Sequence, residues 1–113
     1  MSESDPTGKD QHQPGAKMDA GKPPIVRGAL QYFPLALEHV ARVSAKGAAK
    51  YAWNGWESVP DGFNRYSDAL GRHLLKESSE AIDMDTGEFH AAQVAWNALA
   101  RLELYLRSKP NDR

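Results

Sequence analysis

The apolar residues of this chain recur three or four positions apart, and this spacing constrains the fold more than any other feature of the sequence. From Pro34 to Tyr51, apolar and small residues fall one helical turn apart, and the same pattern returns from about Glu88 to Ser108. Alternating apolar and polar residues, which are typical of a half-buried strand, do not extend over a useful length. The sequence therefore predicts an all-α fold, specifically an antiparallel helical bundle.

A further helical pattern runs from about Phe63 to Ser79. It is preceded by Val59-Pro-Asp-Gly62, which has the composition of a turn. We expect Asp61 or Asn64 to act as the N-cap of this helix, because both side chains offer an oxygen to free backbone N–H groups.

The connection to the last helix is short, from Glu80 to Gly87, so the two helices that flank it should be antiparallel neighbours. Asp85 and Glu88 lie three residues apart and are typical of a capping box, with Asp in place of Ser or Thr. Pro110 is expected to end the last helix, because proline cannot continue the helical hydrogen bonds.

The composition limits the classes of function. The 113 residues are enough for one domain, and the formal net charge of −1 argues against a direct nucleic-acid binder that relies on bulk positive charge. The chain has no cysteine, which excludes a disulfide framework and a thiolate metal site. No membrane-length apolar run and no signal peptide is evident, so the sequence predicts a soluble cytoplasmic protein.

The segment 1–21 lacks aromatic residues and an apolar period, and it is predicted to be a disordered tail. The helical domain is then expected over 22–108. Pro23 and Pro24 hold the chain extended at the boundary. Lys22 is a candidate for phosphate binding, although a solvated linker lysine would have the same surroundings in the sequence.

Polar side chains gather around the break between the last two helices. Residues three, four or seven apart share a helical face, so two polar faces should converge near the turn. The members are His73, Glu77 and Glu80 on the first helix and His90, Gln93 and Asn97 on the second.

The acidic residues near this break allow two interpretations. Glu77 continues the apolar stripe of its helix, and a carboxylate there is costly unless it is paired or bound to a cation. In the first interpretation Glu77, Glu80 and Asp83 bind a hard divalent cation through their oxygens. In the second, the helix end is frayed, Glu77 and Glu80 are exposed, and Asp83 lies in a turn.

An aromatic loop, Ala52-Trp-Asn-Gly-Trp56, follows the first long helix. Trp53 and Trp56 either fill the core or stack on a planar ligand such as a base. Lys50 and Tyr51 precede them. Lys50 suits the negative end of the helix dipole, and it is also placed to contact a phosphate.

The ordered part of the chain, about 25–107, is marginal as an isolated core. The last helix is apolar over a wide arc that includes Trp96. Burial on two sides is expected, which predicts a homodimer or a higher homo-oligomer.

Several chemistries lack their motifs. The chain has no glycine-rich phosphate loop, no HExxH zinc helix and no His-Asp pair of the HD phosphohydrolases. The segment Asp83-Met-Asp85-Thr-Gly87 is similar to the start of a calcium loop, but its glycine falls one position early and Val94 stands where the bidentate acid is needed.

Five short motifs occur in an order that resembles a known phage and prophage family, the dATP/dGTP diphosphohydrolase N-terminal family. They are GKPP, PLALEHVARVSAKGAAKY, NGW, RHLL and DMDTGEFH followed by an asparagine, and they extend over about Lys17 to Leu106. The family is similar to the MazG-like all-α nucleotide pyrophosphohydrolases. The residues that match its motifs are Lys22, Gly47, Lys50, Tyr51, Trp56, Arg72, His73, Asp83, Gly87, His90 and Asn97.

The chain also departs from the family pattern. His39 stands where many members have a glutamate, and Gln93 stands where a second histidine is common. Ser79-Glu80-Ala81 replaces a Gly-Glu-Asp segment. The MazG signature of ExxE with a distant ExxD is not met, because the nearby ExxD overlaps Glu77-Ser-Ser-Glu80.

The resemblance implies metal-dependent hydrolysis of a purine deoxynucleoside triphosphate, dATP or dGTP, to the monophosphate and pyrophosphate, in the host cytoplasm for a phage-encoded protein. Mg²⁺ or Mn²⁺ would be the cofactor, and from the clustered acids we expect Glu77, Glu80 and Asp83 to be the metal ligands. The catalytic residues would be Glu77, His73 and His90. The substrate-binding residues would be Lys22, Lys50, Tyr51, Trp53, Trp56, Arg72 and Asn97. The alternative is a non-catalytic phage module that binds a nucleotide or a protein through the same helices.

Overall fold

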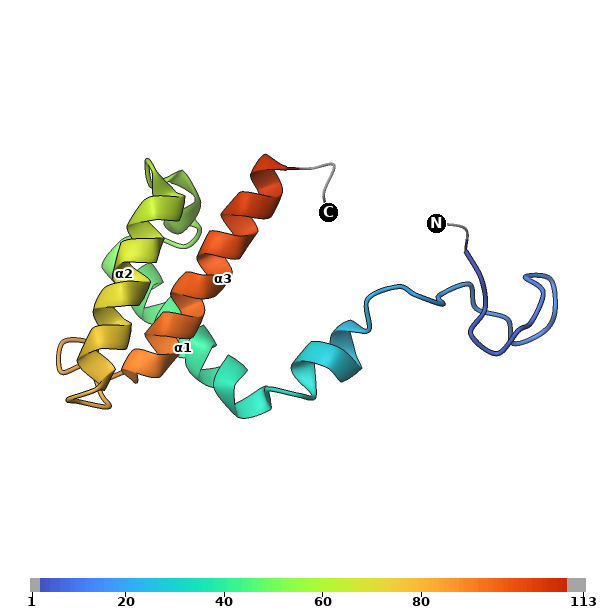
Figure 1. Cartoon of the computed structure of the whole chain (residues 1–113), viewed down its shortest axis with the longest axis horizontal. Helices are drawn as coiled ribbons and strands as arrows, with labels where there is room; N and C mark the ends of the chain where they lie inside the picture. Colours follow the sequence, from blue (N-terminus) through green and yellow to red (C-terminus); the bar gives the residue numbers. More distant parts are fainter. Residues whose placement is uncertain (1–2, 110–113) are drawn as a thin grey trace. The chain divides into compact units, whose positions relative to one another are not determined.

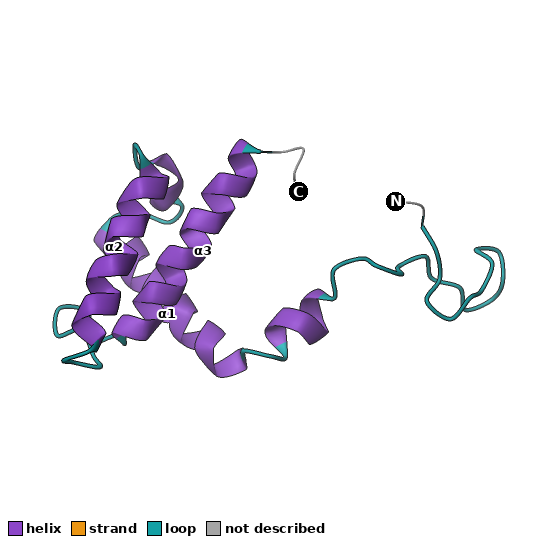
Figure 2. Ribbon diagram, viewed as in Figure 1, coloured by secondary structure: helices purple, strands orange, loops and turns teal. Residues whose placement is uncertain are grey.

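The computed structural model describes residues 3–109 of the chain. These residues form a π-helical turn at Val26–Leu30, helix α1 at Pro34–Lys50, a 3₁₀ turn at Gly55–Ser58, helix α2 at Gly62–Glu77 and helix α3 at His90–Ser108 (Figure 1). Strands are absent from the described part of the chain (Figure 2). The predicted all-α fold is therefore confirmed.

The chain divides into two units at the bond between Phe33 and Pro34. In the second unit α2 and α3 run antiparallel and pack along one another, and α1 packs against α3 (Figure 1). The helices begin and end within about two residues of the predicted positions, because Pro34 suits a first helical turn and the apolar spacing continues to each end.

The predicted helix caps differ from those in the structure. Asp61 occupies the N-cap of α2, but its side chain accepts a hydrogen bond from the amide of Asn64 at 2.9 Å and does not cap a backbone N–H group. The capping box predicted at Asp85 and Glu88 is wrong, because Phe89 is the N-cap of α3. The extended backbone of Phe89 delays the helix start. Pro110 lies outside the described residues.

Apolar burial is sparse in the helical unit. Among the described residues, the hydrophobic side chains that are buried are Ala92 and Ala100, with exposures of 8% and 5%. Larger apolar residues keep much of their surface in contact with solvent, as Leu102 on α3 does. The small core predicted from the sequence is therefore smaller still in a single copy of the chain.

An aromatic cluster joins the helices at one end of the unit. The ring of Tyr66 lies edge-on to Trp56 and to Trp96, with centroid distances of 6.4 and 5.5 Å. The Tyr66 hydroxyl donates to the Trp56 carbonyl at 2.7 Å, and the Trp96 indole N–H donates to Ser44 Oγ at 2.8 Å. Trp56 therefore packs in an aromatic cluster with Tyr66 and Trp96 and stays partly exposed.

In the N-terminal unit, the Asp5 carboxylate accepts hydrogen bonds of 2.6 Å from the backbone N–H groups of Thr7 and Lys17. Lys22 Nζ lies 3.3 Å from a Glu3 carboxylate oxygen. These contacts are local to that unit. The disorder predicted for 1–21 stays a prediction, and residues 1–2 of that segment lie outside the described part.

Across residues 3–109, none of the helices combines the length and the apolar character needed to cross a membrane.

Candidate functional site

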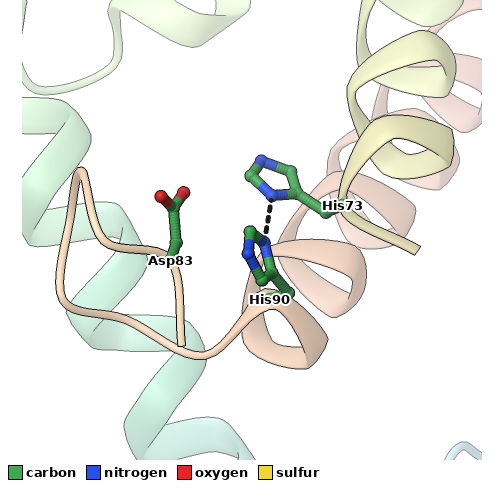
Figure 3. Close-up of side chains that lie close together, drawn as sticks. All are labelled: His73, Asp83 and His90. Atoms are coloured by element: carbon green, nitrogen blue, oxygen red, sulfur yellow. Dashed lines mark hydrogen bonds between the residues drawn. The ribbon is translucent and has the colours of Figure 1, made fainter. Parts of the chain in front are cut away.

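His73 on α2, Asp83 in the α2–α3 connection and His90 at the start of α3 converge on one point. Each offers a nitrogen or a carboxylate oxygen, and these atoms all lie within 4.8 Å of one another (Figure 3). The Nδ1 atoms of His73 and His90 are 2.9 Å apart. The convergence of polar side chains predicted near the turn is present in the structure, and we call these three residues the His–Asp–His cluster.

The backbone of the connection places Asp83 beside His90. The Asp83 N–H group donates to the Glu88 carbonyl at 2.9 Å, and the His90 N–H group donates to the Ala81 carbonyl at 3.0 Å. Gly87 closes the loop by donating to the Asp83 carbonyl at 2.7 Å, and its positive φ of 76° is a conformation that glycine adopts without strain. A narrow hairpin-like loop therefore holds the carboxylate against the first turn of α3.

Glu80 orients the imidazole of His90. One Glu80 carboxylate oxygen lies 2.9 Å from His90 Nε2, and the His90 side chain is wholly buried. A carboxylate can only accept at this contact, so His90 carries its proton on Nε2 when neutral. Its Nδ1 lone pair then points toward His73.

Two donors hold the carboxylate of Asp83. The Asp85 backbone N–H group donates to Oδ1 at 2.9 Å, and the Gln93 amide donates to Oδ2 at 3.1 Å. Burial by itself raises the pKa of Asp83, but these hydrogen bonds and the imidazoles of His90 and His73 outweigh it and bring the pKa below its ordinary value. Asp83 is therefore a carboxylate at neutral pH.

The imidazole of His73 is neutral under the same conditions. Burial is the largest cause that lowers the pKa of His73, and repulsion from a charged His90 lowers this pKa further. A neutral imidazole keeps one nitrogen lone pair available. The cluster thus combines the neutral imidazole of His73 and the buried imidazole of His90 with one ionised carboxylate.

Glu77 does not join this cluster. It is the last residue of α2, its side chain is exposed, and it is absent from the group of residues whose ligand atoms converge. Glu80 contacts the cluster through His90. The prediction that Glu77, Glu80 and Asp83 bind one cation together stays a prediction, because the group of converging ligand atoms contains only Asp83 of these three acids.

A cavity of about 950 Å³ lies in the same helical unit. Its size is within the usual range for small-molecule sites. Its lining includes five of the predicted substrate-binding residues, namely Tyr51, Trp53, Trp56, Arg72 and Asn97. Lys50 contacts its rim through Tyr51, with Nζ 5.2 Å from the ring centroid. Lys22 belongs to the N-terminal unit.

The cavity and the His–Asp–His cluster both draw residues from helices α2 and α3. Arg72 in the cavity precedes His73 of the cluster on α2. On α3, the Asn97 amide in the cavity donates to the Gln93 carbonyl one turn earlier at 2.8 Å.

The sequence model of the family described as dATP/dGTP diphosphohydrolase, N-terminal, matches residues 12–113. The chain belongs to this family. It is 39% identical over 82 residues to a protein of Salmonella phage PMBT28 named dATP/dGTP diphosphohydrolase. The aligned region covers 72% of this chain and 26% of the phage protein, so the chain spans about a quarter of that relative's length. No solved structure matches the chain.

Membership of the dATP/dGTP diphosphohydrolase N-terminal family confirms the resemblance found in the sequence motifs. The structure also shows what unites the motif residues Asp83, Gly87 and His90, since Gly87 closes the loop that carries Asp83 to His90. The sequence did not reveal the bond from Gln93 to Asp83 or the role of Glu80 as partner of His90. The helical spacing of His90 and Gln93 was the available signal, because it places both on one face of α3.

Proposed function

We propose that this chain carries out metal-dependent hydrolysis of dATP or dGTP to the monophosphate and pyrophosphate. The observation that carries the proposal is that an aromatic cavity and the His–Asp–His cluster occur on the same pair of helices, α2 and α3. The phage relative is named for the same pair of nucleotides. From the family resemblance we also propose a MazG-like bundle and a cytoplasmic site of action.

The reaction consumes one water. Its oxygen attacks the α-phosphorus, the bond from that phosphorus to the bridging oxygen breaks, and pyrophosphate leaves with the bonding electrons. The proton released from water passes to a nearby base or to solvent. A divalent cation, Mg²⁺ or Mn²⁺, neutralises phosphate charge and acidifies water when it is bound.

The residues of the chain bind and orient the substrate. Trp53 is 71% exposed at the cavity and is placed to stack on a purine. Arg72 supplies a permanent cation beside the cluster, suited to a phosphate. Asp83 is the ionised ligand for a cation, and His73 adds a neutral imidazole. Lys50 and Tyr51 border the base.

The product test separates this reaction from its alternatives. Purine and pyrimidine deoxynucleoside triphosphates are incubated with the protein and a divalent ion, and the nucleotides are resolved by chromatography. We expect dAMP or dGMP, with inorganic phosphate appearing only after pyrophosphatase is added. Free nucleoside, or phosphate without pyrophosphatase, would refute the proposed cleavage position.

An Arg72→Ala variant tests the contribution of this side chain. Its matched control is Arg42→Ala, because Arg42 is exposed on α1 and pairs with Glu38 at 3.9 Å. We expect the first variant to raise KM for the triphosphate and the second to leave it unchanged. If no nucleotide is turned over by the wild-type protein with any divalent ion, a non-catalytic binding module becomes the better account.

We also propose that the chain self-associates. Leu99, Leu102 and Tyr105 form one stripe along α3, and each is about half exposed. Within residues 3–109, few apolar side chains are buried in one copy of the chain. A second copy would cover the stripe and enlarge the core.

A further inference from the structure

We propose that the His–Asp–His cluster binds one divalent transition-metal ion through Nδ1 of His73, Nδ1 of His90 and a carboxylate oxygen of Asp83, with Glu80 as the outer partner of His90. The role of this ion rests on the proposed function, whereas its binding is argued from the cluster itself. The inference replaces an all-acid magnesium site with a mixed nitrogen and oxygen site, and it leaves Glu77 outside the ligand set.

The separation of the two nitrogens fits a shared ion. Ligand atoms about 2.1 Å from a metal and at right angles to one another lie about 3 Å apart. The Nδ1 atoms of His73 and His90 are 2.9 Å apart. Without an ion, a proton must sit between these atoms, because two lone pairs at this distance repel.

The protonation states also fit. His90 donates its Nε2 proton to Glu80, so its Nδ1 is free to bind a metal. His73 presents Nδ1 to the same point and takes its proton on Nε2 when an ion is bound. Each Asp83 oxygen accepts one hydrogen bond and keeps a second lone pair.

Glu80 completes an arrangement found around protein metals. A metal-bound histidine usually donates its other N–H group to a carboxylate or carbonyl, which fixes the ring and raises its basicity. Glu80 fills this position at 2.9 Å from His90 Nε2.

The donor set selects the class of ion. Mg²⁺ prefers oxygen ligands in a strict octahedron, whereas imidazole nitrogen suits iron, nickel, copper and zinc. Two histidines and one carboxylate leave further coordination positions open. A phosphate oxygen and a water are suited to these open positions.

The test is metal binding in the absence of nucleotide. The full chain, without a polyhistidine tag and freed of metal by chelation, is titrated with Co²⁺, Zn²⁺, Mn²⁺ and Mg²⁺ by calorimetry. Co²⁺ binding is also followed by its visible absorption. We expect one Co²⁺ or Zn²⁺ per chain, bound at least about 100-fold more tightly than Mg²⁺.

Variants assign the ligands. His73→Ala and Asp83→Asn should abolish the Co²⁺ spectrum, and Glu80→Gln should weaken binding by about 10- to 100-fold. Asp85→Asn and His12→Gln are the matched controls, because both side chains are exposed and lie outside the cluster. Both controls should bind Co²⁺ like wild type. Circular dichroism of each variant confirms that it is folded.

Two results would overturn the inference. One is a His73→Ala protein that is folded and still binds Co²⁺ like wild type. The other is loss of binding in Glu77→Gln with His73→Ala unaffected, which would restore the all-acid site. Tight Co²⁺ binding without turnover of any nucleotide would instead refute the proposed function and leave the metal site in place.

Discussion

The side-chain amide of Gln93 lies 3.1 Å from Asp83 Oδ2, and both residues are buried. This bond ties the first turn of α3 to the α2–α3 connection. It is the contact that fixes the direction of the Asp83 carboxylate, because the other donor comes from the loop itself. The orientation of the cluster therefore depends on a residue that is not one of its three members.

Replacing Gln93 by Met keeps the length of the side chain and removes the donor. We expect Co²⁺ affinity to fall by about 10- to 100-fold, since partners of metal ligands have effects of this size. The free energy of unfolding without metal should fall by about 1 to 3 kcal/mol, because a buried acceptor loses a partner. Calorimetry and urea unfolding measure the two effects. Unchanged metal affinity would show that the loop alone orients Asp83.

The two tryptophans of the aromatic loop should behave differently. Trp53→Ala is expected to weaken purine nucleotide binding by roughly 5- to 150-fold, from a stacking contribution of about 1 to 3 kcal/mol, with little change in melting temperature. Trp56→Ala should instead destabilise the fold by about 3 kcal/mol, because its ring packs in the aromatic cluster. Nucleotide titration and thermal melting give the comparison. Equal losses of stability in both variants would contradict it.

Self-association should be visible at micromolar concentration by light scattering. Leu102→Glu places a charge in the apolar stripe of α3 and should shift the protein toward the monomer. Lys46→Glu, an exposed change on α1, is the control and should leave the assembly intact. A wild-type monomer at this concentration would show that the stripe remains open to solvent.

Removing the residues before Lys17 should preserve helicity and nucleotide hydrolysis, because this segment lacks aromatic residues and an apolar period that could contribute to a core. Lys22→Ala in the full chain tests the predicted phosphate contact separately. We expect it to raise KM for the triphosphate and to leave the melting temperature unchanged. Loss of helical signal in the truncated protein would contradict the prediction of a dispensable tail.

The helices could be predicted because their signals are local. The apolar spacing from Pro34 to Lys50 and the turn before Gly62 each involve residues close in sequence. The start of α3 could not be placed in this way. Asp85 and Glu88 satisfy the rule for a capping box, but the pairing of Ile82 with Phe89 keeps the chain extended for longer.

The sequence predicted that polar side chains would converge near the turn, but it did not predict the hydrogen-bond partners of these side chains. Helical periodicity placed His73 and His90 on converging faces, and the structure confirms this. The same periodicity placed Glu77 with His73, although Glu77 is exposed where α2 ends. Contacts across the loop, such as that of Glu80 with His90, depend on backbone hydrogen bonds that no spacing rule encodes.

Among the described residues, His90 is the one whose side chain is completely removed from solvent. That place in a small domain usually belongs to a leucine or a phenylalanine. An apolar residue at position 90 would remove the need to satisfy a buried imidazole and should raise the free energy of unfolding. The same change would remove a proposed metal ligand, so we expect stabilising substitutions at this position to abolish the proposed activity. Relatives with the proposed hydrolase activity should therefore keep histidine at position 90. Relatives that fold but lack this activity should carry an apolar residue there.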